Sequence, residues 1–177
     1  MARILPLNAV TLTGLLSWVQ DITTIGTYHD QLRRIAHQNH EITELSNVLI
    51  FLFLDRAMCD TATCHELFHR YMNKVREHID LVDRNLYGRL LAHSNHGIQN
   101  LVRHFLSGSQ EIRKIMSDVL REWCPAKKTP TLEISHHGRF LADTEKLSRL
   151  ILERFRDETG KLHPLIRKIS GNQQHVA

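Results

Sequence analysis

A run of apolar residues at helical spacing, between residues 67 and 91, constrains this chain more than any other feature. The run has no proline, and its one glycine lies near its end. Its apolar side chains recur at steps of three and four, which places them on one face of a helix: Tyr71, Val75, Ile79, Val82, Leu86 and Leu90. His78 lies beside this stripe as either a hydrogen-bonded core histidine or a ligand. The run therefore predicts an amphipathic helix that packs against a core.

Three other long segments carry the same pattern. The periodicity predicts helices over residues 28–55, 64–92, 98–123 and 132–158. A chain of 177 residues with only four prolines and eight glycines is expected to form one all-α domain. Four long helices with short connections predict an up-down-up-down four-helix bundle over residues 28–166. An N-terminal amphipathic segment, 1–27, precedes this bundle, and a flexible tail, 167–177, follows it.

The N-terminal segment is free of charge between residues 4 and 20. Polar residues interrupt its apolar run, so it is expected to form an extra amphipathic helix and not a membrane span. A turn around Gly26 is predicted to separate this helix from the next. The segment is expected to pack on the body of the protein or on a partner, including a second copy of the chain.

Local signals predict the ends and irregularities of the helices. Thr63, with Glu66 three residues later, fits a capping box at the start of the 64–92 helix. Residues 93–97 predict a turn, residues 124–131 a loop, and Gly108 a kink. The apolar run VLIFLFL at 48–54 predicts burial on more than one side of its helix.

Composition narrows the classes of function. The net charge of +4 comes from dispersed Lys and Arg residues, so we expect no nucleic-acid partner. The three cysteines, Cys59, Cys64 and Cys124, are expected to be reduced thiols in a cytoplasmic protein. Thirteen histidines in a helical chain raise the question of a metal site. One pair, His65 and His69, lies one turn apart and could bind a metal ion on the surface of its helix, but two exposed histidines are the favoured interpretation.

Three segments resemble the hemerythrin-like (HHE cation-binding) family. In that family a His is followed four residues later by a Glu and then by Leu-Tyr/Phe-Pro. HIDLVDRNLYGRLL, at 78–91, looks like the first copy of this pattern, and RFRDETGKLHPLI, at 154–166, looks like the second. NHEITELSNVL, around His40, is similar to the family's first helix. The resemblance covers residues 28–166.

The resemblance implies a metal pocket inside the bundle. The residues that match ligand positions are His40, His78, His104 and Glu158. Two positions depart from the pattern, because Val82 replaces the first Glu and Arg154 replaces the second His. Two irons need carboxylates to bridge them, so the remaining set implies one iron, a degenerate di-iron site or no metal. Asp83 is displaced by about 100° from the lost ligand and would need a local bulge to replace it.

The arginine favours an interior without metal. Arg154 is spaced to pair with Glu158 at i,i+4, and a buried pair of this kind needs no ion. The run RFR-x-E at 154–158 is also similar to the last helix of the Rsd/AlgQ family, bacterial bundles that bind the major sigma factor.

Two functional hypotheses follow. The first is a hemerythrin-like protein with a reduced metal site that senses oxygen, nitric oxide or redox state. The second is a metal-free bundle that regulates a protein partner such as a sigma factor, through segment 5–22 and its basic helix faces. Enzymatic activity at a di-iron centre is the least favoured, because the bridging carboxylates are incomplete.

Overall fold

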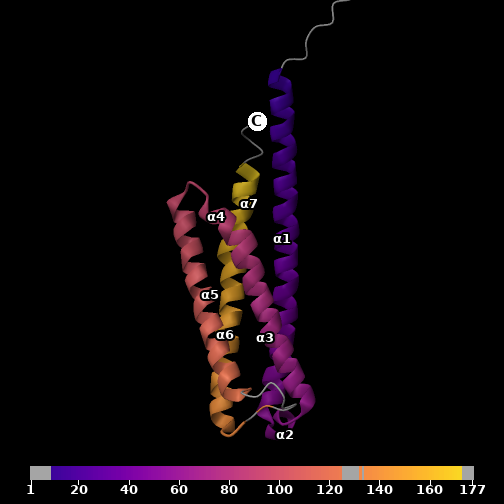
Figure 1. Ribbon diagram of the computed structural model, residues 1–177, viewed down its shortest axis with the longest axis vertical. Coiled ribbons are helices and arrows are strands. Elements are labelled where there is room, and N and C mark those ends of the chain that lie inside the picture. The colour runs from indigo at the N-terminus through magenta and orange to yellow at the C-terminus, as the bar shows by residue number, and fades with distance from the viewer. Residues whose placement is uncertain (1–8, 125–131, 133, 173–177) are drawn as a thin grey trace, which may run out of the picture. The chain divides into compact units, whose positions relative to one another are not determined.

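The structure is helical throughout the part of the chain that it describes. A computed structural model describes residues 9–124, 132 and 134–172, with side chains for 30–124, 132 and 134–169. The elements, with η for π-helix, are α1 (Ala9–Leu54), α2 (Arg56–Cys59), α3 (Ala62–Val82), η1 (Asp83–Tyr87), α4 (Gly88–Leu91), α5 (His96–Trp123), α6 (His137–Asp157), η2 (Glu158–Leu162) and α7 (His163–Asn172) (Figure 1). No strand occurs in these ranges, which confirms the all-α class. None of the helices described is long and apolar enough to cross a membrane.

The chain divides into two compact units. The larger unit is Ile35–Glu158, and the smaller one combines Met1–Arg34 with Thr159–Ala177. In the smaller unit the buried side chains, among those described, are Leu32, Leu162, His163 and Ile166. The candidate functional residues discussed below all lie in the larger unit.

The core of the larger unit follows from the apolar stripes of its helices. All six residues of the predicted stripe on α3, η1 and α4 are buried. The stripe of α5 is buried as well, at Ile98, Val102, Phe105, Ile112, Met116, Val119 and Trp123. The part of the first stripe from Tyr71 to Ile79 and the part of the α5 stripe from Ile112 to Trp123 share a core with residues of α1 and α6. The α1 members are Ile42, Leu49 and Phe53, and the α6 members are Phe140, Leu147, Ile151 and Phe155. The 3.6-residue period of the sequence therefore determines which sides of these helices meet.

Four aromatic rings join the four long helices of the larger unit at one point. Phe140 of α6 is fully buried, and its ring lies 4.7 Å from that of Phe53 and 5.5 Å from that of Trp123, centroid to centroid. Phe68 of α3 completes the group at 6.4 Å from Phe140. The contacts are edge-to-face, the arrangement that the charge distribution of aromatic rings favours.

The predicted turn at residues 23–27 is wrong. α1 runs without interruption from Ala9 to Leu54, so the extra N-terminal helix and the 28–55 helix are one element. No proline lies within α1, and a single glycine such as Gly26 costs a helix only about 1 kcal/mol relative to alanine, which does not end it. The side chains of the segment proposed for packing, at residues 5–22, lie outside the described residues.

The other corrections concern helix ends. The N-cap of α3 is Thr61 and not Thr63, because the hydroxyl of Thr61 accepts a hydrogen bond from the backbone of Cys64 at 3.2 Å. α5 begins inside the predicted 93–97 turn, where Asn95 caps it by accepting from the backbone N–H groups of Gly97 and Ile98. α6 begins at His137, later than the predicted 132. Residues 125–131 of the predicted loop lie outside the described part.

The C-terminal helical run extends beyond its predicted end. Instead of ending near Glu158, it continues through η2 into α7, which reaches Asn172. Pro164 is tolerated because it lies in the first turn of α7, next to a π-helical segment where the regular backbone hydrogen bonds are already altered. Part of the predicted 167–177 tail is therefore helical, and residues 173–177 are not described.

Candidate functional site: a buried network of Glu158, Arg154 and His78

Glu158 is a carboxylate inside the larger unit, with 1% of its surface exposed. Its Oε1 accepts hydrogen bonds from Nε of Arg154 at 2.7 Å and from the hydroxyl of Tyr87 at 3.2 Å. Its Oε2 lies 3.2 Å from Nε2 of His78, whose Nδ1 faces Oε1 of Gln38 at 3.3 Å. Both oxygens of the carboxylate are therefore engaged by side chains of the protein, as a buried charge requires.

Arg154 fills the position next to Glu158 and is 8% exposed. Besides its bond to Glu158, it donates from Nη1 to the carbonyl of Phe105 at 2.6 Å. Its Nη2 donates to the hydroxyls of Tyr87 at 3.0 Å and Ser109 at 2.9 Å. The guanidinium carbon also lies 4.9 Å from the centre of the Phe105 ring. The predicted pairing of Arg154 with Glu158 is confirmed, and the remaining partners come from α5 (Phe105 and Ser109) and from η1 (Tyr87).

Gly108 of α5 makes room for this guanidinium. A Cβ atom added to Gly108 would lie 3.1 Å from Nη1 of Arg154. The guanidinium of Arg154 cannot move away easily, because it donates four hydrogen bonds to its neighbours. The predicted kink does not interrupt the helix, since α5 continues through this residue. The glycine is therefore required by the close approach of a side chain and not by a bend of its own backbone.

Gly108→Ala is expected to lower the free energy of unfolding by about 1 kcal/mol, although alanine favours helix by a similar amount. The matched control is Gly88→Ala in α4, where an added Cβ meets nothing within 4 Å, and we expect it to stabilise by about 0.5–1 kcal/mol. Urea unfolding of both variants measures the difference. Equal stabilisation by the two substitutions would show that Arg154 does not occupy this space.

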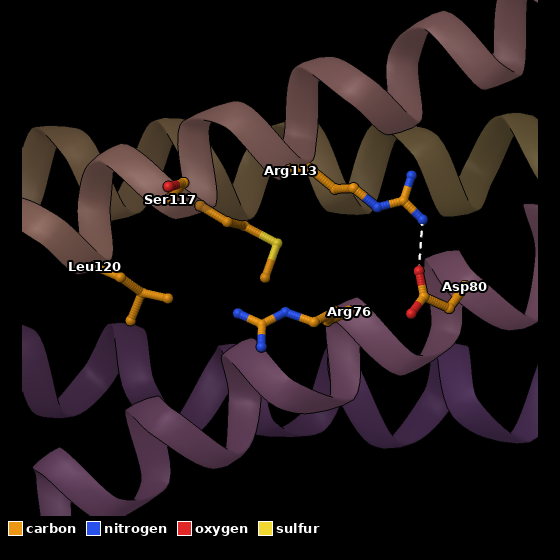
Figure 2. A pocket seen from close by; sticks show the side chains of 6 residues that line it. Arg76, Asp80, Arg113, Ser117 and Leu120 are labelled. Atoms are coloured by element: carbon orange, nitrogen blue, oxygen red, sulfur yellow. Dashed lines mark hydrogen bonds and ion pairs between the residues drawn. The ribbon is translucent and has the colours of Figure 1, made fainter. Parts of the chain in front are cut away.

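The network continues from the interior to the surface. The hydroxyl of Ser109 donates to Asp83 at 2.8 Å, and Nη1 of Arg113 donates to the same carboxylate at 2.8 Å. Arg113 also donates to Asp80 at 2.6 Å, and this pair lies at the edge of a surface pocket of about 250 Å³. Figure 2 shows Arg76 of α3 at the same pocket, opposite the α5 residues. A chain of hydrogen-bonded side chains therefore connects Glu158 to half-buried Arg113 at the pocket.

Two of the three acidic residues of the network, Asp83 and Glu158, stand at the start of a π-helical segment. η1 begins at Asp83 and η2 begins at Glu158. A π-turn carries an extra residue and rotates the side chains that follow it, and such turns occur often at functional sites. Asp83 would need a local bulge to replace the ligand lost at Val82, and η1 is an irregularity of this kind. Asp83 nevertheless binds Ser109 and Arg113, while Val82 is buried beside it.

The surroundings of Glu158 set its protonation. Burial alone would raise the pKa of this carboxyl, but the hydrogen bond and charge of His78 and the charge of Arg154 outweigh burial and hold the pKa below its ordinary value of 4.5. Burial raises the pKa of the Tyr87 hydroxyl, and the neighbouring charge of Glu158 raises it further. The network thus combines the ionised carboxylate of Glu158 with the protonated phenol of Tyr87.

These pKa shifts predict acid sensitivity. A carboxyl whose folded pKa is lowered stabilises the fold above its unfolded pKa and loses that contribution as the pH falls through the folded pKa. We therefore expect the free energy of unfolding to fall as the pH drops below 4.5, and Glu158→Gln to flatten this decline. Urea unfolding at a series of pH values below and above 4.5 measures the decline in the free energy of unfolding. The control is Glu153→Gln, because Glu153 is exposed. An identical decline in wild type and Glu158→Gln would show that Glu158 does not cause the loss of stability in acid.

Two of the four predicted ligands come together and two do not. His78 and Glu158 are in contact, whereas His40 and His104 are both exposed. Asn39 takes the buried position next to His40. Within the described residues, these four do not form a group of ligand atoms within 4.8 Å of one another.

The donors around Glu158 do not fit the metal that the hemerythrin-like resemblance implies. A metal ion needs lone pairs of carboxylate and imidazole that point at a common centre. Here Arg154, Tyr87 and His78 surround the carboxylate, and the guanidinium adds a fixed positive charge that would repel a cation. The chemistry of this set is that of a self-contained buried ion pair.

A different cluster was predicted only in part: the sequence offered His65 and His69 as a metal-binding pair but favoured exposed side chains, and it gave no sign of Cys124. His65, His69 and Cys124 are half-buried, and their potential ligand atoms all lie within 4.8 Å of one another. The sequence signal was present, because residues 65–69 read H-E-L-F-H, which fits the H-E-x-x-H pattern of helical zinc sites. The other two cysteines are core thiols: burial raises the pKa of Cys59 to about 11 and that of Cys64 to about 12.

Comparisons with known proteins leave the resemblances as predictions. The chain matches no family model, no curated protein and no solved structure.

Proposed function

We propose that this protein is a helical regulator that binds a protein partner, and that its interior carries an ion-pair network where a hemerythrin-like protein would hold metal. In this proposal the second half of α1 with α3, α5 and α6 forms an up-down-up-down four-helix bundle. The metal-free interior is supported by the Arg154–Glu158 contact at 2.7 Å. The alternative, a metal sensor built on His40, His78, His104 and Glu158, is less favoured because two of these histidines are exposed.

The observation that carries the partner-binding function is an exposed apolar surface on α1 and α2. Its members are large apolar side chains that face solvent: Val48, Ile50, Phe51, Leu54 and Met58. Phe51 is 73% exposed and Leu54 is 67% exposed, so the prediction that this run is buried on more than one side is wrong for the part of the chain that the structure describes. Large apolar side chains that face solvent mark interaction sites in soluble proteins where they gather in a patch. We call these five residues the α1–α2 apolar surface.

The charges around this surface indicate the kind of partner. Glu44 lies one helical turn before Val48, and Asp55 lies one turn after Phe51, so acidic residues flank the α1 part of the α1–α2 apolar surface on both sides. Asp60 adds a third carboxylate, which is paired with Arg56 at 3.9 Å. An amphipathic helix with an apolar face and flanking Lys or Arg residues complements this pattern. We commit to such a helix of another protein as the occupant.

Site-specific photo-cross-linking tests the proposal in cells that express the full chain. A photoreactive residue replaces Phe51, and the matched control carries it at exposed Gln110 of α5. We expect position 51 to capture one partner through a segment with an apolar stripe flanked by basic residues. A synthetic peptide of that segment should bind the protein more weakly as salt rises, and at least about tenfold more weakly to Phe51→Asp.

Three outcomes would overturn this assignment. Cross-links to a second copy of the chain would identify a homodimer interface instead. Cross-links at position 51 no stronger than at position 110 would show that the α1–α2 apolar surface has no partner. Capture of an acidic or non-helical segment would refute the proposed chemistry, even if the captured protein were a sigma factor.

A further inference from the structure

Two histidines and a cysteine from distant parts of the sequence meet at the surface of the larger unit. His65 and His69 lie one turn apart on α3, and their ring centroids are 4.5 Å apart. Cys124 is the C-cap residue of α5, so the end of that helix fixes its position. The potential ligand atoms of these three residues lie within 4.8 Å of one another, and no other group of this kind occurs in the part of the chain described.

The spacing of the histidines suits a metal ion. Residues i and i+4 of a helix project from one face, so two imidazoles at this spacing can bind one ion. Helical zinc sites use this pattern in H-E-x-x-H, and here His65, Glu66 and His69 reproduce it. A histidine-rich chain can contain the pattern by chance, but the thiol of Cys124, 55 positions after His69 in the sequence, adds an independent donor to the pair.

We propose that His65, His69 and Cys124 bind a zinc ion. Two imidazole nitrogens and one thiolate are donors that zinc prefers, and three protein ligands leave a fourth tetrahedral position for water or another donor. In such a site neighbouring ligand atoms are separated by roughly 3.3–3.6 Å, as follows from metal–ligand bonds of about 2.0–2.3 Å. The observed separations, all within 4.8 Å, need only small side-chain rotations to reach this geometry.

The environment of the cluster favours metal binding over protonation. Burial lowers the pKa of His69, and the neighbouring His65 lowers it further, which favours the neutral form of the imidazole. Cys124 is half-buried, in contrast to Cys59 and Cys64, which have no exposed surface. This zinc site is separate from the Glu158 network and does not depend on the proposed partner.

Cobalt(II) titration of the full-length, untagged protein tests the proposal, because cobalt reports its ligands by its spectrum. We expect one equivalent of cobalt to produce a thiolate-to-cobalt charge-transfer band and the visible bands of tetrahedral cobalt. One equivalent of zinc should displace the cobalt and abolish both signals. Cys124→Ser should remove the charge-transfer band. His65→Ala and His69→Ala should each weaken binding about tenfold or more.

Control variants separate this site from other donors. His40→Ala removes an exposed histidine elsewhere and should leave the spectrum unchanged. Circular dichroism should show the same helix content for all variants, so that loss of binding is not loss of folding. A charge-transfer band that survives Cys124→Ser, or the absence of such a band in the wild type, would overturn the proposal. Stoichiometric cobalt with purely nitrogen and oxygen ligands would refute the proposed ligand set as well.

Discussion

Arg154→Met is expected to lower the free energy of unfolding by about 3–5 kcal/mol. The substitution keeps most of the side-chain volume but removes the cation that pairs with buried Glu158. It also leaves the carbonyl of Phe105 and the hydroxyl of Ser109 without the donor that now binds them. The uncompensated charge of Glu158 causes most of the loss, because this carboxylate has no access to water. Urea unfolding at neutral pH measures the effect.

Two further variants show whether the loss comes from the pair itself. Arg156→Met, two residues away and exposed, should change the stability by no more than about 0.5 kcal/mol. The double variant Arg154→Met/Glu158→Met removes both charges together. Its loss in the free energy of unfolding should therefore be smaller, by about 0.5–3 kcal/mol, than the sum of the losses of the two single variants. Strict additivity, or a loss for Arg154→Met as small as that for Arg156→Met, would contradict a buried coupled pair.

Phe140→Ala is expected to destabilise the fold by about 3–5 kcal/mol. The fully buried ring of Phe140 contacts rings of α1, α3 and α5, so its removal leaves a cavity where the four long helices of the larger unit meet. Thermal or urea unfolding measures this loss.

The matched control is Phe51→Ala, which deletes the same ring from a position that is 73% exposed. We expect a change within about 0.5 kcal/mol there, because little apolar surface is returned to water. Similar losses for the two variants would mean that Phe51 is buried in solution, which would argue for an interface between copies of the chain.

Sequence periodicity predicted most of the helical architecture. The stripe from Tyr71 to Leu90 is buried as expected, since the 3.6-residue period follows from helix geometry alone. The helix ends were less predictable: Thr61 and Thr63 both suit an N-cap, and the capping-box spacing of Glu66 favours Thr63, whereas the helix begins after Thr61. The π-helical segments also escaped prediction. They begin at Asp83 and Glu158 and rotate the side chains that follow, and the apolar pattern of a regular helix does not show where such a turn is inserted.

The candidate site was predictable only where its contacts are local in sequence. The bond from Arg154 to Glu158 spans one helical turn and followed from i,i+4 spacing. The partners from other helices, Tyr87 and Ser109, needed the three-dimensional arrangement of α5 and η1. His40 and His104 were placed near the inner faces of their helices, yet both are exposed, because a boundary residue can turn either way. The H-E-x-x-H spacing at 65–69 was visible in the sequence, but its cysteine partner was not.

Iron binding by the interior tests the central claim most directly. The measurement uses full-length, untagged protein carrying His65→Ala, His69→Ala and Cys124→Ser, so that the surface cluster contributes no metal. After anaerobic incubation with ferrous iron and desalting, the iron content is determined by mass spectrometry, with Glu158→Gln added to the same background for comparison. We predict substoichiometric iron that Glu158→Gln does not change, because Arg154 and Tyr87 already engage the carboxylate. One or more irons per chain, lost on Glu158→Gln, would contradict the account.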